Sequence, residues 1–202
     1  MSNALKRKSK KMQPVGYSKK EIISINKYSK ERSKMNGITY NAYLDVRLIA
    51  YQTLHDKFGF GQKRIVQLEN TVNTYLEKNR TDKNMSTGAL VCFLKEKAGI
   101  DIGKEVNRIP YRECVLLSGE QKPLPETGKL VAAAIYNYFA LSCVALKTVF
   151  KFSSKKMCEY MNWIRYYINT LARKNQFDLT IKDIAVVLMD ECKYCDARFE
   201  KR

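Results

Sequence analysis

Two basic turns with side chains suited to binding nucleic acid lie ninety-two positions apart in the chain. Gln62, Lys63 and Arg64 follow one pair of phenylalanines, and Lys155 and Lys156 follow another. A helix, a tight turn and a second helix that opens with such residues is typical of a helix-turn-helix, whose second helix donates to base edges and phosphates. An ordinary helix corner with solvated lysines has the same pattern. We expect contact with DNA through this corner, the first copy more than the second.

The N-terminal residues add a second basic element. The chain has a net charge of +17 and a pI of about 9.6, which indicates a polyanionic partner. Residues 1–17 contain no acidic side chain and are too polar to bury a core, so they predict a flexible arm. A nucleic-acid arm and a merely solubilising tail both fit. The candidate contacts here are Lys6, Arg7, Lys8, Lys10 and Lys11, and Arg165 in the second half of the chain joins them.

Metal binding and catalysis find little support in the residue pattern. Cys192 and Cys195 have the spacing of a metal knuckle, but a structural zinc needs four ligands and a second pair is absent. A redox pair or two inert thiols are the alternatives. His55 and Asp56 are neighbours on a helix, so they point about 100° apart and do not form a base with its orienting partner. We predict a protein that is not an enzyme and has no cofactor.

The elements that position these residues are predicted to be helices. Apolar positions recur at helical spacing, and Gly59 and Gly99 are suited to end helices in the left-handed conformation. Ser18, Ser86 or Thr87, and Thr180 are candidate N-caps. Asn36-Gly37 predicts a further helix end. The expected helices cover residues 19–35, 41–57, 61–79, 86–99, 130–150, 153–174 and 181–191.

The same layout occurs twice, so the chain is interpreted as two diverged copies of a three-helix unit. The identical pairs at an offset of ninety-two are Ala42 and Ala134, Leu54 and Leu146, Phe58 and Phe150, Phe60 and Phe152, Lys63 and Lys155, Asn70 and Asn162, and Tyr75 and Tyr167. We therefore predict an all-α protein with an arm at 1–17, a helix at 18–37, repeats at 38–100 and 129–202, and a connector at 101–128. Within the connector, residues 111–117 could form a short strand.

A stretch without charge and the cysteines bear on the location of the protein. Residues 130–146 are slightly short for a membrane span and are more simply a central buried helix. Cys92, Cys143 and Cys158 are expected on apolar helix faces, as reduced thiols. The N-terminal charges are not followed by an apolar stretch, so we expect no secretory signal. These patterns favour a reducing cytoplasm without membrane attachment.

Aromatic residues concentrate on the second helix of the second copy. Tyr160, Trp163, Tyr166 and Tyr167 could stack unpaired bases, but aromatics on both sides of a helix are more typical of packing. The packing partner could be the first copy or another subunit, and a homodimer is one outcome.

The stretch from Leu54 to Ile65, Leu-His-Asp-Lys-Phe-Gly-Phe-Gly-Gln-Lys-Arg-Ile, resembles a motif of small helical phage and prophage proteins of Gram-positive bacteria. The similarity covers residues 43–100 and, more weakly, residues 133–192. It implies one such helical unit per copy and a viral accessory protein in the cytoplasm of a bacterial host.

Three functional hypotheses follow. A nucleic-acid-binding factor, with DNA favoured over RNA, agrees best with the charge distribution. A phage module that inhibits a host or defence protein is the alternative, and a structural or packaging role in the virion is the third.

Overall fold

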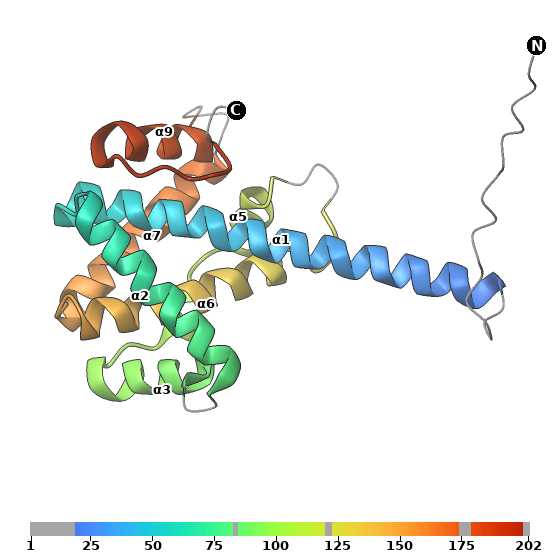
Figure 1. Ribbon diagram of the computed structural model, residues 1–202, viewed down its shortest axis with the longest axis horizontal. Coiled ribbons are helices and arrows are strands. Elements are labelled where there is room, and N and C mark those ends of the chain that lie inside the picture. The colour runs from blue at the N-terminus through green and yellow to red at the C-terminus, as the bar shows by residue number, and fades with distance from the viewer. Residues whose placement is uncertain (1–18, 83–84, 120–122, 174–178, 200–202) are drawn as a thin grey trace, which may run out of the picture. The chain divides into compact units, whose positions relative to one another are not determined.

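The chain is helical throughout the part that the structure describes. The computed structural model describes the backbone of residues 19–82, 85–119, 123–173 and 179–199 (Figure 1). Within these ranges there is no strand, and the helices are α1 (Lys19–Phe58), α2 (Gln62–Thr81), α3 (Thr87–Ala98), α4 (Ile102–Asn107), α5 (Tyr111–Leu117), α6 (Thr127–Thr148), α7 (Ser154–Ala172) and α9 (Ile181–Cys192). The predicted all-α class is confirmed. The predicted arm at 1–17 and the Ser18 cap lie outside the described residues.

The helix end predicted at Asn36-Gly37 is wrong, because α1, which is forty residues long in total, continues through this position to Phe58. Gly37 does not adopt the left-handed conformation that a glycine cap requires. A glycine inside a helix costs only about 1 kcal/mol relative to alanine. Burial of Ile38 and Ala42, which lie on the following turns, favours the helix instead. By their contacts, residues 1–36 and 37–202 form two separate units.

The strand considered for residues 111–117 is also wrong, because they form α5. Cys114 and Leu117 are buried and lie three residues apart, which is helical spacing. Pro110 precedes the helix, where its missing amide is no loss. The preceding helix α4 begins at Asp101, whose Oδ1 accepts a hydrogen bond from the Lys104 amide. Within its described residues, the connector thus contains two short helices that contribute to the core, and its last two residues belong to α6.

Equivalent backbone conformations recur at the corners of the two predicted copies. Gly59 has φ 64° after α1, and Lys151, ninety-two positions later, has φ 56° after α6. The Phe60 amide donates to the Leu54 carbonyl at 3.1 Å, and the Phe152 amide donates to the Leu146 carbonyl at 3.0 Å. In both corners the amide that follows the left-handed residue thus donates back to the last turns of the helix, as at other helix ends with a left-handed residue. The corner therefore keeps its conformation even where a lysine replaces the glycine.

The third helices of the copies recur in the same way. The Ser86 side chain caps α3 and the Thr180 side chain caps α9, which confirms both predicted caps. Gly99 ends α3 with φ 65°, and Lys193 follows α9 with φ 54°. These positions are ninety-four apart, because the loop before α9 is two residues longer.

Contacts between the copies are reciprocal. The ring of Phe58 lies 5.1 Å from that of Phe152, and the ring of Phe60 lies 5.0 Å from that of Phe150. Tyr75 Oη lies 3.0 Å from Thr148 Oγ1, and the equivalent Tyr167 donates to Asp56, the equivalent of Thr148. In a two-fold interface, a contact of residue i in one copy with residue j in the other is matched by a contact of residue j in the first copy with residue i in the second. These pairs follow that rule. The duplication itself stays a prediction, which this geometry supports.

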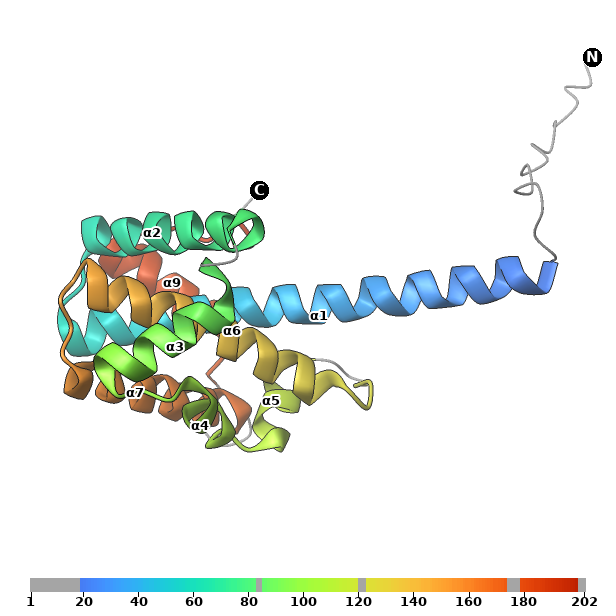
Figure 2. The same ribbon diagram turned by 90° about the horizontal axis from the view of Figure 1, so that it is seen from below.

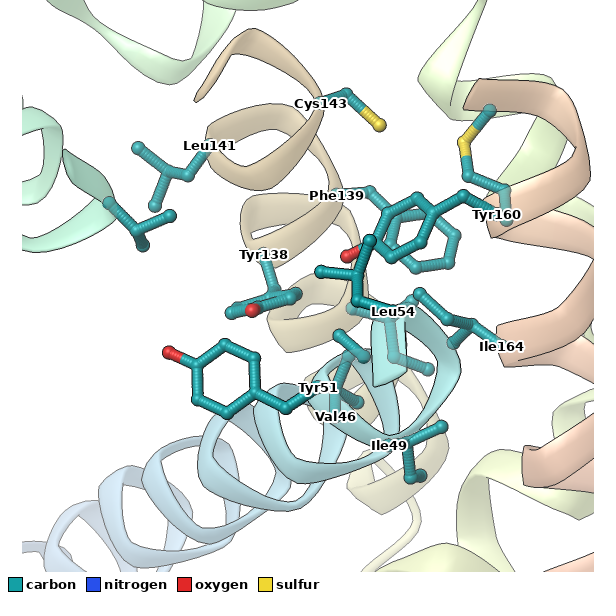
Figure 3. Packing of buried hydrophobic residues seen from close by; sticks show 14 of the residues in the cluster. Val46, Ile49, Tyr51, Leu54, Tyr138, Phe139, Leu141, Cys143, Tyr160 and Ile164 are labelled. Carbon is teal, nitrogen blue, oxygen red and sulfur yellow. The ribbon is translucent and has the colours of Figure 1, made fainter. Parts of the chain in front are cut away.

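The core lies where α1, α6 and α7 meet (Figure 3). Tyr51 and Leu54 of α1 lie beside Tyr138 and Phe139 of α6, and Ile164 of α7 completes the cluster. All five side chains are fully buried. Burying one such side chain stabilises the fold by about 1.5–3 kcal/mol, so these helices form the base on which the corners are fixed.

Helix α6 contains the uncharged stretch noted in the sequence. Among the described helices, it is the one long and apolar enough to cross a membrane, and 67% of its most apolar window is buried inside the protein. The run from Tyr138 to Leu146 is entirely buried, as a central helix requires. The location of the protein in the cell stays a prediction.

Candidate nucleic-acid interface

The two phenylalanine corners together form an open groove. Because Phe58 and Phe60 pack against Phe152 and Phe150, the first turns of α2 and α7 come close together across this contact. The groove is lined by Lys57, Phe58, Phe60, Arg64, Gln67, Phe150, Phe152, Lys156 and Glu159. Eight of these nine residues form four pairs at the ninety-two-residue offset. We call this surface the corner groove.

Three cations of the corner groove are placed by aromatic rings. The Arg64 guanidinium lies 5.5 Å from the centre of the Phe60 ring, and Lys156 Nζ lies 5.8 Å from that of Phe152. Lys57 Nζ lies 3.9 Å from the centre of the Trp163 ring. Attraction to the face of a ring orients a cation without neutralising its charge. The corner groove thus presents ordered positive charge.

The cations of the corner groove are also exposed. Lys57, Arg64 and Lys156 form no ion pair with any carboxylate in the described parts of the chain. Glu159 is the one acidic residue in the lining. Phe58 and Phe150 are half-buried beside these charges. A surface with three unneutralised cations above an aromatic floor can hold the phosphates of a polyanion.

A second surface continues from the corner groove along α2. A shallow hollow on this helix is lined by Lys63, Val66, Gln67, Asn70, Thr71, Thr74 and Tyr75. Gln67 lines both surfaces, so they are continuous. Figures 1 and 2 show α2 on the outside of the unit formed by residues 37–202.

The structure separates the predicted site residues into groups. Lys63, Arg64, Lys155 and Lys156 are all exposed on the first turns of α2 and α7. Gln62 Nε2 donates to the Lys193 carbonyl at 3.1 Å, so this amide is already engaged. The arm residues Lys6, Arg7, Lys8, Lys10 and Lys11 lie outside the described ranges.

Arg165 lies apart from the corner groove. Its guanidinium donates to Glu105 of α4 and to Asn162, and only 17% of its side chain is exposed. This ion pair joins α7 to the connector helices. Arg165 is therefore used within the fold, whereas the sequence suggested that it would face a ligand.

The aromatic residues of α7 divide between core and surface. Tyr160 is fully buried and donates to Ser142 Oγ at 3.2 Å. Trp163 lies under Lys57, and Tyr166 remains 57% exposed. Packing is therefore the role of Tyr160.

The cysteines differ from expectation at two positions. Cys92 and Cys158 are exposed, so their predicted placement on apolar faces is wrong, whereas Cys143 is buried. Cys92 and Cys158 lie on the exposed sides of their helices. The presence of one small apolar residue in a sequence does not show which side of a helix it occupies. Cys192 is buried and Cys195 is exposed, and both are free thiols. Among the residues that the structure describes, no three potential ligands cluster to hold a metal ion.

His55 and Asp56 have separate partners. His55 Nε2 lies 2.7 Å from Glu191 Oε2, and Nδ1 lies 3.1 Å from the Phe60 carbonyl oxygen. Asp56 instead accepts from Gln52 and Tyr167. Burial acts to lower the pKa of His55, but its bonds to Glu191 and Phe60 outweigh burial and raise that pKa. The contact of His55 with Glu191 joins the end of α1, at the first corner, to α9.

Lys57 and Gln67 are the residues of the interface that sequence reasoning missed. Lys57 belongs to the last turn of α1, before the corner, and Gln67 lies one turn beyond the basic start of α2. The offset alignment could have pointed to Gln67, because both Gln67 and its counterpart Glu159 are polar.

Comparison of the chain with protein-family models, curated proteins and solved structures found no match.

Proposed function

We propose that the protein binds nucleic acid without catalysing a reaction, and that the corner groove holds the phosphate backbone. The observation that carries this proposal is the set of three exposed cations, Lys57, Arg64 and Lys156, brought together from three helices. The net charge of +17 and the basic N-terminal residues favour the same class of partner. DNA is the favoured polymer.

The resemblance of residues 54–65 to phage and prophage proteins supports a regulatory or accessory role in the cytoplasm of a bacterial host. A role of this kind needs binding alone.

Salt dependence of binding tests the proposal directly. Binding to a duplex of about twenty base pairs is measured by fluorescence anisotropy between about 50 and 200 mM salt, where each phosphate contact contributes about 0.9 to the logarithmic slope. The variant Lys57→Ala/Arg64→Ala/Lys156→Ala is expected to lose about two to three units of slope. The proposal is wrong if the full chain shows no salt-sensitive binding.

A variant with the same loss of charge elsewhere provides the control. Lys95, Lys97 and Lys104 are exposed on α3 and α4 and do not line the corner groove. The variant Lys95→Ala/Lys97→Ala/Lys104→Ala is expected to keep most of the slope. Equal losses in the two variants would show that total charge, and not the corner groove, controls binding.

Binding to a protein is the second candidate function, and one observation favours it. Val186 and Met189 of α9 are 41% and 43% exposed and lie three residues apart, so they form an apolar pair on one helix face. The native mass and the ultraviolet absorbance of the protein purified from its host distinguish the two candidates. A stoichiometric protein partner without nucleic acid would support this second function.

A further inference from the structure

The outer face of α2 carries a largely exposed stripe of four uncharged polar residues with one lysine and one valine. Lys63, Val66, Gln67, Asn70, Thr71 and Thr74 recur every three or four positions, so they share one side of the helix. Most are exposed, including Val66 at 39%. We call them the α2 stripe.

The side chains of the α2 stripe are of the types that read base edges. Gln67 and Asn70 carry amides that can donate and accept at the same time, the pattern that adenine presents in the major groove. Thr71 Oγ1 and Thr74 Oγ1 donate to carbonyls of their own helix, each at 2.8 Å, and these bonds fix their rotamers. The stripe contains no acidic residue that would repel phosphates.

The dimensions of the stripe fit a duplex groove. From Lys63 to Thr74 the helix rises about 17 Å at 1.5 Å per residue, which equals about five base pairs at 3.4 Å each. The major groove of B-form DNA, about 12 Å wide, admits a helix. The major groove of A-form RNA is too narrow for side chains to read, so this geometry selects DNA.

The α2 stripe and the corner groove can act together. They meet at Gln67, and the groove cations Arg64 and Lys57 lie beside the first turn of α2. Phosphate contacts fix the register of a protein on a duplex, and base contacts supply specificity. A helix with cations at one end and amides along its face provides both.

The equivalent face of α7 has lost this character. Its corresponding positions include Glu159, Trp163 and Tyr166, and Asn162 accepts a hydrogen bond from Arg165. An acid and bulky rings do not suit a phosphate-lined groove. One reading helix per chain is therefore expected, although two corners hold the backbone.

We propose that the α2 stripe enters the major groove of B-form DNA and recognises a site of about five base pairs, chiefly through Gln67 and Asn70. This inference depends on the proposed function, because it takes the phosphate contacts of the corner groove as given.

Selection from a pool of randomised DNA duplexes by the full chain tests the inference. An enriched sequence is expected, and its affinity is then compared with that of a scrambled duplex. Gln67→Ala and Asn70→Ala are each expected to lower this ratio by roughly ten-fold, the loss of one bidentate base contact, with the salt slope unchanged. Asn107→Ala is the matched control, because Asn107 is exposed at the end of α4 and does not line the hollow on α2, and its ratio should stay the same.

The outcomes separate the two proposals. Salt-sensitive binding without enrichment, an unchanged ratio in both stripe variants, or tighter binding to duplex RNA overturns the reading role of α2 and leaves the proposed function intact. Absence of any salt-sensitive binding overturns both.

Discussion

The ring of Phe60 packs against that of Phe150 at 5.0 Å, although ninety residues separate them in the chain. Phe60 is 2% exposed and donates its amide to Leu54, so it fixes the corner and the contact between the two halves at once. The direction in which α2 and α7 leave the core therefore depends on this pair.

Replacing Phe60 with alanine is expected to lower the free energy of unfolding by about 3–5 kcal/mol, because a buried aromatic ring is removed and a cavity remains. Chemical denaturation measures the loss. Tyr40→Ala is the control, since Tyr40 is 64% exposed and its removal should cost less than about 0.5 kcal/mol. A double-mutant cycle with Phe150→Ala should give a coupling of about 0.5–1.5 kcal/mol, and additive losses would contradict the pairing.

Replacing Lys151 with glycine is expected to stabilise the protein. Lys151 has φ 56°, which costs a residue with a Cβ about 1–2 kcal/mol, whereas glycine adopts it freely. Glycine also increases the conformational entropy of the unfolded chain, which offsets part of this effect. The net increase in the free energy of unfolding is expected to be about 0.5–1 kcal/mol. Lys155→Gly, within α7, should instead destabilise by about 1 kcal/mol. Thermal or urea unfolding compares the two, and equal signs would contradict this account.

Replacing Arg47 with methionine is expected to destabilise the protein by about 2–3 kcal/mol, because Glu69 loses its cation in a partly buried ion network and Asp196 keeps only Arg198. Arg47 donates to Glu69 at 3.0 Å and to Asp196 at 3.1 Å, and only 2% of the Asp196 side chain is exposed. Faster amide exchange over residues 193–199 should accompany the loss, because these bonds hold that segment to α1. Arg108→Met removes an exposed ion pair and should cost less than about 1 kcal/mol.

The bonds of His55 are expected to stabilise the fold at low pH. Both ring nitrogens face acceptors, Glu191 and the Phe60 carbonyl, so the protonated ring satisfies both. Because the pKa is raised in the fold, the stabilisation is complete below the unfolded value of about 6.5 and disappears as pH rises through the folded pKa.

Comparing the wild type with His55→Gln between pH 5 and about pH 9 measures this contribution. The difference in unfolding free energy should shrink with rising pH, and a difference that grows would contradict the assignment. Because His55 is the only histidine, its ring protons also give the folded pKa directly by NMR. Glu191→Gln should lower that pKa, since Asp56 is then the remaining nearby carboxylate among the groups that raise it.

Local signals predicted most of the fold. The side chains of Ser86 and Thr180 cap the starts of α3 and α9, and Gly99 ends α3 in the left-handed conformation. These helix ends depend on short local motifs, so they follow from the sequence. The helix end predicted at Asn36-Gly37 was wrong because such a motif can either end a helix or lie within one. Burial of the residues on the following turns favours the continued helix, and the motif itself does not show this burial. The strand considered for residues 111–117 was wrong because the periodicity of a short apolar run does not distinguish a strand from a buried helix.

The site could be predicted only in part. The basic first turns of α2 and α7 are visible in the sequence because their composition is local. The groove between them depends on the contact of Phe58 with Phe152, which no local pattern contains. The ion pair of Arg165 with Glu105 likewise joins residues sixty positions apart, so its engagement could not be foreseen.

The near-symmetric contact of the corners within a single chain has an evolutionary consequence. In a homodimer every substitution occurs in both subunits, so a binding face and its counterpart must change together. Here a substitution in α7 leaves α2 untouched. Under the predicted duplication, α7 could acquire Trp163 and Tyr166 while α2 kept Gln67 and Asn70, so that only α2 retained the side chains of the proposed base contacts.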